Sequence, residues 1–215
     1  MRIVAVFGGP KTPPVLWWLT GSLLMIELFA QLGDRGLLAG YDLRAWLISN
    51  GAFWDFLFPP GRVDQALYPG QSYVMLLTHA FLHAGTLHVI MNAVIFIALA
   101  KTLALAYGLR AVLLMSTVGA VASGVAFGLL ETTAAPMVGA SGVVFCLIGV
   151  WLYATRESAK ALGQPTRSVA SILIGLVLIH VLLHVFMGGM IAWQAHLGGF
   201  VAGFFVVPWL VRPLA

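Results

Sequence analysis

Six apolar stretches dominate this sequence, and each is long enough to cross the hydrocarbon core of a lipid bilayer, which takes about 20 helical residues. They occupy about 15–32, 86–105, 111–130, 137–154, 169–187 and 190–211. Only 8% of the 215 residues are charged and 61% are hydrophobic, whereas roughly a quarter of the residues in a soluble domain are charged. We therefore expect an all-α, polytopic integral membrane protein with six transmembrane helices, forming a single domain over residues 1–215.

Basic residues predict how these helices are oriented, because Lys and Arg concentrate in cytoplasmic loops. Eight basic residues fall on one side of the expected bundle, namely Arg2, Lys11, Lys101, Arg110, Arg156, Lys160, Arg167 and Arg212. Only Arg35, Arg44 and Arg62 fall on the other side, so both chain ends are expected in the cytoplasm. The basic residues form no run, so the positive net charge does not indicate a nucleic-acid partner. The single cysteine, Cys146, excludes an internal disulfide and a cysteine-bound metal cluster.

The only long connection spans residues 33–85, and it is rich in aromatic residues and proline. These are Trp46, Phe53, Trp54, Phe56, Phe58, Pro59, Pro60, Tyr68, Pro69 and Tyr73. Since Trp and Tyr favour the level of the lipid headgroups, we expect this loop to be embedded in the outer face of the membrane. A loop of this length in a compact protein is usually functional.

Polar side chains within the apolar stretches are unfavourable in lipid and are therefore candidates for function. They are Glu27, His88, Asn92, Ser141, His180, His184, Gln194 and His196. If the second, fourth and sixth helices enter from the outer face, the helical rise places His88 about 3 Å and Asn92 about 9 Å below the start of their helix. The same rise places Ser141 about 6 Å and His196 about 9 Å below the starts of theirs. Four polar groups from three helices are thus expected at a similar depth.

Small residues surround Ser141 and His196 at helical spacing, a pattern that lets helices approach closely in lipid. They are Gly139, Gly142, Cys146 and Gly149 on the fourth helix, and Ala195, Gly199 and Gly203 on the sixth. A serine that can hydrogen-bond to a histidine is the minimum for nucleophilic acyl transfer, because the imidazole can take the hydroxyl proton. His88 and Asn92 lie one helical turn apart, and with the Ser141 N–H they could hold the negative charge of the attacked carbonyl oxygen.

Three segments together resemble the rhomboid intramembrane serine proteases. They are Thr78-His79-Ala80-Phe81-Leu82-His83 with His88 and Asn92, then Gly139-Ala140-Ser141-Gly142, then Ala195-His196-Leu197-Gly198-Gly199 with Gly203. The resemblance implies a Ser141–His196 dyad without a carboxylate, oxyanion contacts from His88 and Asn92, and substrates that are themselves transmembrane proteins. It also implies that the long loop lies in the outer leaflet and that the fifth helix acts as a lateral gate. The short six-helix form is similar to bacterial members, which implies the inner membrane of a bacterium.

The resemblance also gives supporting roles to His83 in the loop and to Phe145, which stands where many relatives have a tyrosine that stacks on the histidine. Two family patterns are replaced in this chain. Ala100-Lys101-Thr102-Leu103-Ala104 stands in place of Gly-x-x-x-Glu, and Val74-Met75 in place of a Trp-Arg pair.

Several alternatives remain open at this stage. His88 and Asn92 could bridge helices by hydrogen bonds alone, and a non-catalytic rhomboid-like protein that binds transmembrane clients is the main alternative function. His180 and His184 are spaced like a two-imidazole metal site, but no H-E-x-x-H motif accompanies them, so we expect no metal and no other cofactor. A transporter is a further alternative, although paired broken helices are not visible. Glu27 is expected to face the bundle in a structural role, and the oligomeric state is not predicted.

Overall fold

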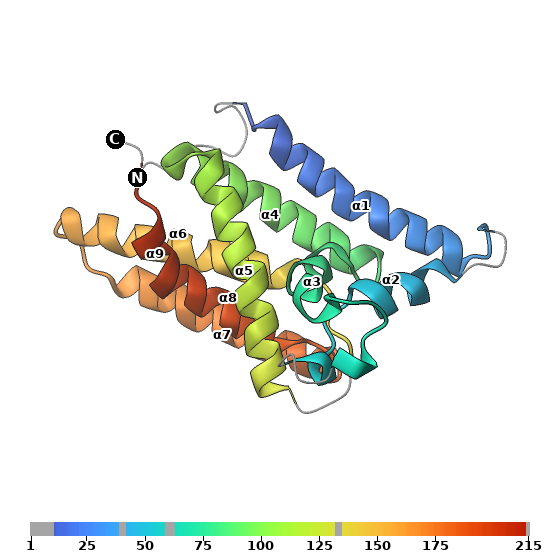
Figure 1. Ribbon diagram of the computed structural model, residues 1–215. Coiled ribbons are helices and arrows are strands. Elements are labelled where there is room, and N and C mark those ends of the chain that lie inside the picture. The colour runs from blue at the N-terminus through green and yellow to red at the C-terminus, as the bar shows by residue number, and fades with distance from the viewer. Residues whose placement is uncertain (1–10, 39–41, 59–62, 132–134, 214–215) are drawn as a thin grey trace.

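The computed structural model describes residues 11–38, 42–58, 63–131 and 135–213 (Figure 1). Within these ranges the regular secondary structure is helical, apart from one isolated bridge that pairs Phe53 with Met137. Some residues used in the sequence analysis lie outside the described residues, namely Arg2, Pro59, Pro60 and Arg62.

Among the described residues, four helices are long and apolar enough to cross a membrane, and they coincide with the first, second, third and fifth predicted spans. They are α1 (Pro14–Asp34), α4 (Thr86–Tyr107), α5 (Leu109–Leu130) and α7 (Arg167–Phe186). Pro14 suits the first position of α1, where a backbone N–H has no acceptor in the helix. Gly108 separates α4 from α5 with a φ of 83°, a left-handed conformation that glycine adopts readily.

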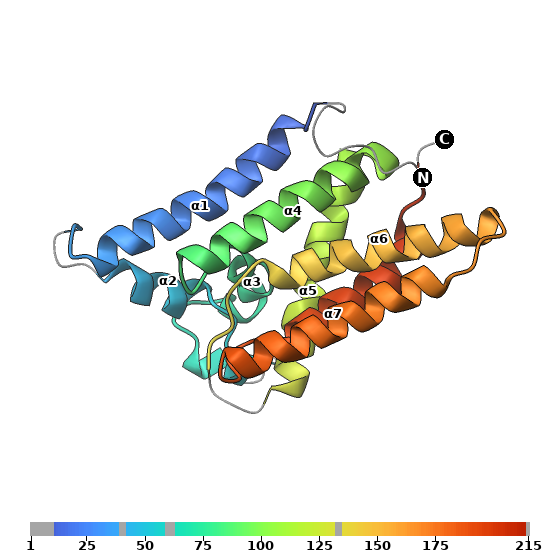
Figure 2. The ribbon, with the colours of Figure 1, turned by 180° about the vertical axis from the view of Figure 1, so that it is seen from behind.

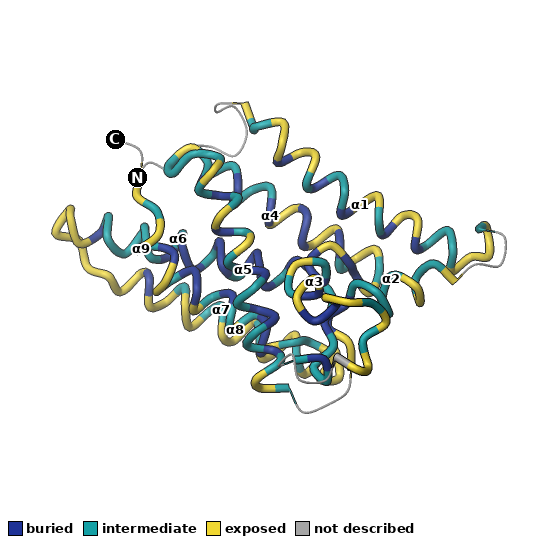
Figure 3. Tube along the Cα trace, in the orientation of Figure 1, coloured by how far each residue is buried: buried dark blue, intermediate teal, exposed yellow. Residues whose placement is uncertain are grey.

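The helix α6 (Ser141–Ala161) lies at the centre of the bundle, in contact with α4, α5 and α8 (Trp193–Val201). The helix α1 packs along α4, and α7 lies at the periphery beside α6 (Figures 1 and 2). Burial follows this arrangement, because nine residues of α6 are buried whereas Val169 is the only residue of α7 that is buried (Figure 3). Arg156, Glu157 and Lys160 lie toward the end of α6, where their side chains are 40–47% exposed, and they lower the hydropathy of this helix.

Glycine allows α6 and α8 to pack backbone against backbone. A Cβ atom added to Gly199 would collide with the carbonyl oxygen of Gly142, and one added to Gly203 would collide with the carbonyl oxygen of Cys146. Such contact through small residues is the principal way in which helices associate closely in lipid. The crossing of α6 with α8 therefore requires glycine at position 199, and the contact of α6 with residues 202–206, which follow α8, requires glycine at position 203.

The start of the fourth predicted span, at residue 137, is wrong. The helix begins at Ser141, because Met137 forms two backbone hydrogen bonds of 2.9 Å with Phe53 instead of helical ones. Gly139 has a φ of 130°, which is also incompatible with a helix. Ser141 is thus the first residue of α6 and does not lie about one turn into it. At its other end the helix extends past the predicted residue 154 to Ala161.

The sixth predicted span, 190–211, is not one continuous α-helix and begins later than expected. It consists of α8 (Trp193–Val201), the π-helical segment η4 (Ala202–Val206) and α9 (Val207–Leu210). The ring of Pro208 has no N–H to donate and would clash with the carbonyl of Phe204 in a regular α-helix. The wider π-helical turn before Pro208 accommodates this proline.

The long connection between α1 and α4 is folded and packs against the bundle. Its elements are α2 (Leu43–Gly51), η1 (Asp55–Leu57), η2 (Val63–Gln65), α3 (Gln71–Thr78) and η3 (His79–Phe81). Phe53, Leu57 and Met75 are fully or almost fully buried and form one apolar cluster with Phe127 of α5. This cluster fixes the loop against α5, close to the start of α6.

Candidate active site

Ser141 and His196 are joined by a short hydrogen bond at the crossing of α6 and α8. The distance between Ser141 Oγ and His196 Nε2 is 2.6 Å. Ser141 is the first residue of α6, and His196 lies in the first turn of α8, three residues before Gly199. The close approach of Gly199 to Gly142 therefore also brings the two functional side chains together.

The position of Ser141 at the start of α6 adds a second chemical feature. The first N–H groups of a helix have no acceptor within the helix, and the N-terminal end of the helix carries partial positive charge. Ala140, the N-cap residue, makes no capping hydrogen bond through its side chain among the described residues. The Ser141 N–H is consequently suited to bind a negatively charged oxygen beside its own hydroxyl.

Two aromatic rings contact the imidazole of His196. Phe145, one turn after Ser141 on α6, stacks on it with ring centroids 4.4 Å apart and an angle of 11° between the planes. His180 of α7 meets it edge to face, at a centroid distance of 4.9 Å. The Nδ1 atoms of His180 and His196 are 3.4 Å apart. His196 is thus in contact with its serine, with a flat apolar ring and with a second imidazole.

The loop between α1 and α4 holds the four residues that precede Ser141. In addition to the Phe53–Met137 pair, the Gly139 N–H donates to the carbonyl of His79 at 2.9 Å, and the Ala140 N–H donates to His83 Nε2 at 3.4 Å. These bonds replace the helical hydrogen bonds that residues 137–140 lack. The loop therefore sets where α6 begins and, with it, where Ser141 lies.

The two loop histidines that make these bonds are neutral. Burial lowers the pKa of His83 to about 3, and the neighbouring His88 contributes to the same shift. A neutral imidazole can accept the Ala140 N–H at its unprotonated Nε2, whereas a doubly protonated ring could not. Burial also lowers the pKa of His79, to about 4, and its Nε2 lies 3.2 Å from the Ala120 carbonyl of α5.

Arg44 of α2 connects the loop to α1. Its guanidinium contacts two carboxylates, that of the buried Glu27 at 2.9 Å and that of the exposed Asp34 at 2.7 Å. It also donates a hydrogen bond to the carbonyl of His83 at 2.9 Å. The hydrogen bond to Glu27 raises the pKa of Arg44 above its ordinary value. Glu27, which the sequence analysis expected to be structural, thus anchors the loop segment that contains His83.

His88 faces the same point as the serine hydroxyl. A Cβ atom placed on Gly139 would lie 2.9 Å from His88 Nε2 and 3.7 Å from Ser141 Oγ, so the absence of a side chain there makes room for the His88 ring. Asn92 is one turn further along α4, and its Nδ2 is buried without a hydrogen-bond partner among the described residues. A buried amide that donates to no protein group is available to an incoming ligand.

Other residues selected from the sequence lie beside this arrangement. Ala195 is buried at the crossing, and Gln194 donates to Glu131 at 2.8 Å. His184 lies one turn beyond His180, and its Nδ1 has no hydrogen-bond partner in the described part of the chain. That part also contains no cluster of three or more His, Cys, Asp or Glu side chains arranged for a metal ion.

Sequence reasoning gave no role in this site to four residues that shape it: Phe53, Arg44, His79 and His180. His180 carried a signal, as a polar residue in an apolar stretch, but its partner on another helix could not be identified. Arg44 and Phe53 carried none beyond their place in a long loop.

Comparison with known proteins agrees with this picture. A family model described as the rhomboid domain matches residues 70–213. The rhomboid protease GlpG of Yersinia pestis (strain Pestoides F) is 29% identical over 149 residues, which cover 67% of this chain and 52% of the relative. The protein of the same name from Yersinia enterocolitica serotype O:8 / biotype 1B is 30% identical over 167 residues, which cover 77% of this chain and 57% of the relative. The chain thus spans about half the length of the curated relatives it matches.

Long apolar helices, together with a hydrogen-bonded serine and histidine where α6 crosses α8, define the class, a helical membrane protein with a Ser–His pair. The chain belongs to the rhomboid family, since the family model covers well over half of it. The apolar helices and the bacterial relatives support a protein of a bacterial inner membrane.

Proposed function

We propose that this protein is an intramembrane serine endopeptidase that hydrolyses peptide bonds in or near the transmembrane segments of other membrane proteins. The observation that carries the proposal is the distance of 2.6 Å between Ser141 Oγ and His196 Nε2. The family membership and the similarity to the Yersinia proteins named rhomboid protease GlpG support the same reaction class.

In the proposed reaction, His196 Nε2 takes the proton of the Ser141 hydroxyl while Oγ attacks the carbonyl carbon of the scissile bond. The protonated His196 then gives that proton to the leaving amine as the C–N bond breaks. A water molecule, deprotonated in turn by His196, attacks the acyl carbon, and His196 returns the proton to Ser141 Oγ as the ester bond breaks. No Asp or Glu is needed for this proton transfer, and no metal or cofactor takes part.

The negative charge that develops on the carbonyl oxygen is held by three donors in this proposal: the Ser141 N–H, His88 and the side-chain amide of Asn92. The partial positive charge at the start of α6 and the unpartnered Nδ2 of Asn92 support these assignments. His88 and Asn92 come from one face of α4, so a single helix would supply both side-chain donors.

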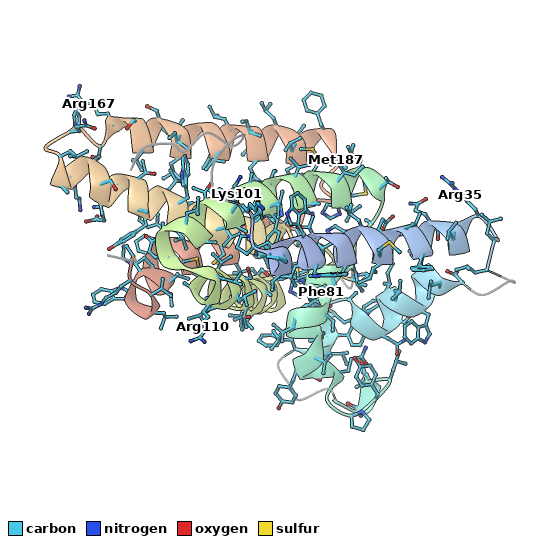
Figure 4. The ribbon with its side chains drawn as sticks, turned by 90° about the horizontal axis from the view of Figure 1, so that it is seen from above. Arg35, Phe81, Lys101, Arg110, Arg167 and Met187 are labelled. Atoms are coloured by element: carbon cyan, nitrogen blue, oxygen red, sulfur yellow. The ribbon has the colours of Figure 1, made fainter. Side chains whose placement is uncertain are left out.

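We further propose six membrane spans in one domain, with both chain ends in the cytoplasm and the loop at 33–85 in the outer leaflet. At the helical rise, α6 is about 31 Å long and the unit from α8 to α9 about 27 Å, lengths close to the ~30 Å hydrocarbon core. Arg35 and Arg167 lie at opposite ends of the molecule, as this orientation requires (Figure 4). Thiol labelling of intact cells that carry Gly163→Cys or Met190→Cys tests it, with only Met190→Cys expected to react from outside.

The alternative function is a non-catalytic protein that binds transmembrane clients. Such a protein would not need an activated serine. A serine that is hydrogen-bonded to an imidazole and lies at a helix N-terminus therefore favours the enzyme.

Labelling with a fluorophosphonate probe distinguishes the two. The purified protein in detergent should be labelled, and both Ser141→Ala and His196→Ala should lose the label while they keep the thermal midpoint of the unaltered protein. Ser171→Ala is the matched control, because Ser171 is an exposed α7 serine that hydrogen-bonds only to its own helix at the Arg167 carbonyl. Labelling that persists in Ser141→Ala, or a folded protein that is never labelled, would overturn the proposal.

A further inference from the structure

We propose that His180 is a positioning residue that orients the imidazole of His196 by accepting a hydrogen bond at its own Nδ1. This inference rests on the proposed Ser141–His196 function. His180 belongs to α7, whereas Ser141 and His196 belong to α6 and α8, so a third helix takes part in the arrangement. The contact that carries the inference is the 3.4 Å separation of the two Nδ1 atoms.

The direction of this hydrogen bond follows from the proposed function, in which Ser141 Oγ–H donates to His196 Nε2. That nitrogen must then be unprotonated, so the single proton of the neutral His196 ring is on Nδ1. The nearest nitrogen to that proton is Nδ1 of His180, which must then be the unprotonated nitrogen of its own ring. Each imidazole thereby fixes the tautomer of the other.

Orientation matters for His196 because no carboxylate holds its second nitrogen. Phe145 fixes the plane of the imidazole by stacking but has no polar atom, and a ring flipped by 180° about its Cβ–Cγ bond would stack equally well. A polar partner at Nδ1 distinguishes the two ring orientations. His180 supplies this partner, with the rings edge to face at 67°.

The bond should strengthen during the reaction. When His196 takes the serine proton, its Nδ1–H becomes part of a cation, and hydrogen bonds from charged donors are shorter and about twice as strong as neutral ones. The 3.4 Å separation in the resting state leaves room for this shortening. Because Val169 is the only residue of α7 that is buried, the contact also makes the orientation of His196 depend on the position of α7.

The test compares three variants of the full-length protein by the second-order rate constant of fluorophosphonate labelling. His180→Leu removes the acceptor, whereas His180→Asn keeps an acceptor oxygen at the δ position. His184→Leu is the matched control, one turn away on the same helix. We expect labelling to slow about tenfold in His180→Leu, to recover largely in His180→Asn and to be unchanged in His184→Leu.

A second measurement distinguishes orientation from a merely structural role. Nitrogen-15 NMR of histidine-labelled protein reports the tautomer of each of the six imidazoles, and the His196 signal is identified by its loss in His196→Ala. We expect His196 to carry its proton on Nδ1 in the unaltered protein and to show a mixture of tautomers in His180→Leu.

The outcomes separate this inference from the function on which it rests. An unaltered protein that is not labelled at Ser141 would refute the proposed function. Normal labelling of both the unaltered protein and folded His180→Leu, or a His196 proton on Nε2, would refute the role of His180 alone. If His180→Leu does not fold, the labelling of His180→Asn and the tautomer in the unaltered protein decide the question.

Discussion

The imidazole of His196 lies flat against the ring of Phe145, with centroids 4.4 Å apart and planes 11° from parallel. Phe145 and Ser141 are one turn apart on α6, so a single helix presents both the hydroxyl that His196 contacts and the surface on which it rests. The serine and the histidine are therefore aligned by three features: this stack, the hydrogen bond between them, and the close contact of Gly199 with Gly142.

Replacing Phe145 by Leu should slow fluorophosphonate labelling of Ser141 about 2- to 10-fold, because an aromatic stack contributes roughly 0.5–1.5 kcal/mol beyond its buried area. Leucine keeps an apolar side chain but offers no flat face. Phe145→Tyr keeps the ring and should be labelled at close to the original rate. Equal rates for the Leu and Tyr variants would show that the stack does not orient His196.

Gly199→Ala should destabilise the protein by about 1–3 kcal/mol or more and abolish labelling, because the new Cβ would collide with the Gly142 carbonyl and push α8 away from α6. Thermal unfolding in detergent measures the first effect. The control is Gly175→Ala on α7, where a Cβ would have no neighbour within 4 Å. This variant should unfold at or above the original temperature and keep full labelling; a similar loss in both would argue against backbone contact as the cause.

Arg44→Met should lower the free energy of unfolding by about 3 kcal/mol, because it leaves the Glu27 carboxylate, 3% exposed, without its cation. Denaturation in mixed micelles measures the change. The double variant that combines Arg44→Met with Glu27→Gln should recover part of the lost stability, because the buried charge is also removed. Arg35→Met is the control, since Arg35 projects away from the bundle (Figure 4). A loss of the same size in Arg35→Met would mean that general surface charge, rather than the Glu27 pair, is responsible.

Stability should fall as the pH is lowered below about 6.5. Burial lowers the pKa of His79 to about 4 and that of His83 to about 3, from an ordinary value of 6.5, so the unfolded chain binds protons that the folded loop does not. The stability that the two neutral imidazoles contribute is fully present above pH 6.5, their pKa in the unfolded chain. It declines as the pH falls toward their pKa values in the folded protein, and about 1.4 kcal/mol per imidazole is lost at pH 5.5. Thermal midpoints between pH 8 and 5 test this, and His79→Gln should show a smaller slope than the unaltered protein. A flat profile for the unaltered protein would contradict the burial of these rings.

The spans that sequence predicted best are those with clear boundaries. The helix α4 starts at Thr86 as predicted and ends at Tyr107, two residues beyond the predicted end, because Gly85 and Gly108 interrupt the apolar pattern on both sides. The start of α6 was predicted too early, since residues 137–140 are as apolar and small as the helix that follows. Their pairing with Phe53 and His79, from a loop far away in the sequence, could not be inferred from local periodicity.

The sequence could predict which site residues lie together on one helix, because this depends only on their spacing. Ser141 and Phe145 on α6, or His88 and Asn92 on α4, share a face because residues four apart do so in any helix. The meeting of His180 with His196 depends on how α7 is rotated about its own axis. A helix that is apolar on all sides has no pattern that indicates this rotation, so the second imidazole beside His196 emerges only from the structure.

Cleavage of a membrane-embedded substrate tests the central claim most directly. The protein and a single-span test substrate, reconstituted together in liposomes, should yield two fragments whose masses place the cut within or beside the transmembrane segment. Ser141→Ala in the same liposomes should leave the substrate at its intact mass. Fragments of the same masses, formed at the same rate by both proteins, would contradict the assignment of Ser141 as the nucleophile.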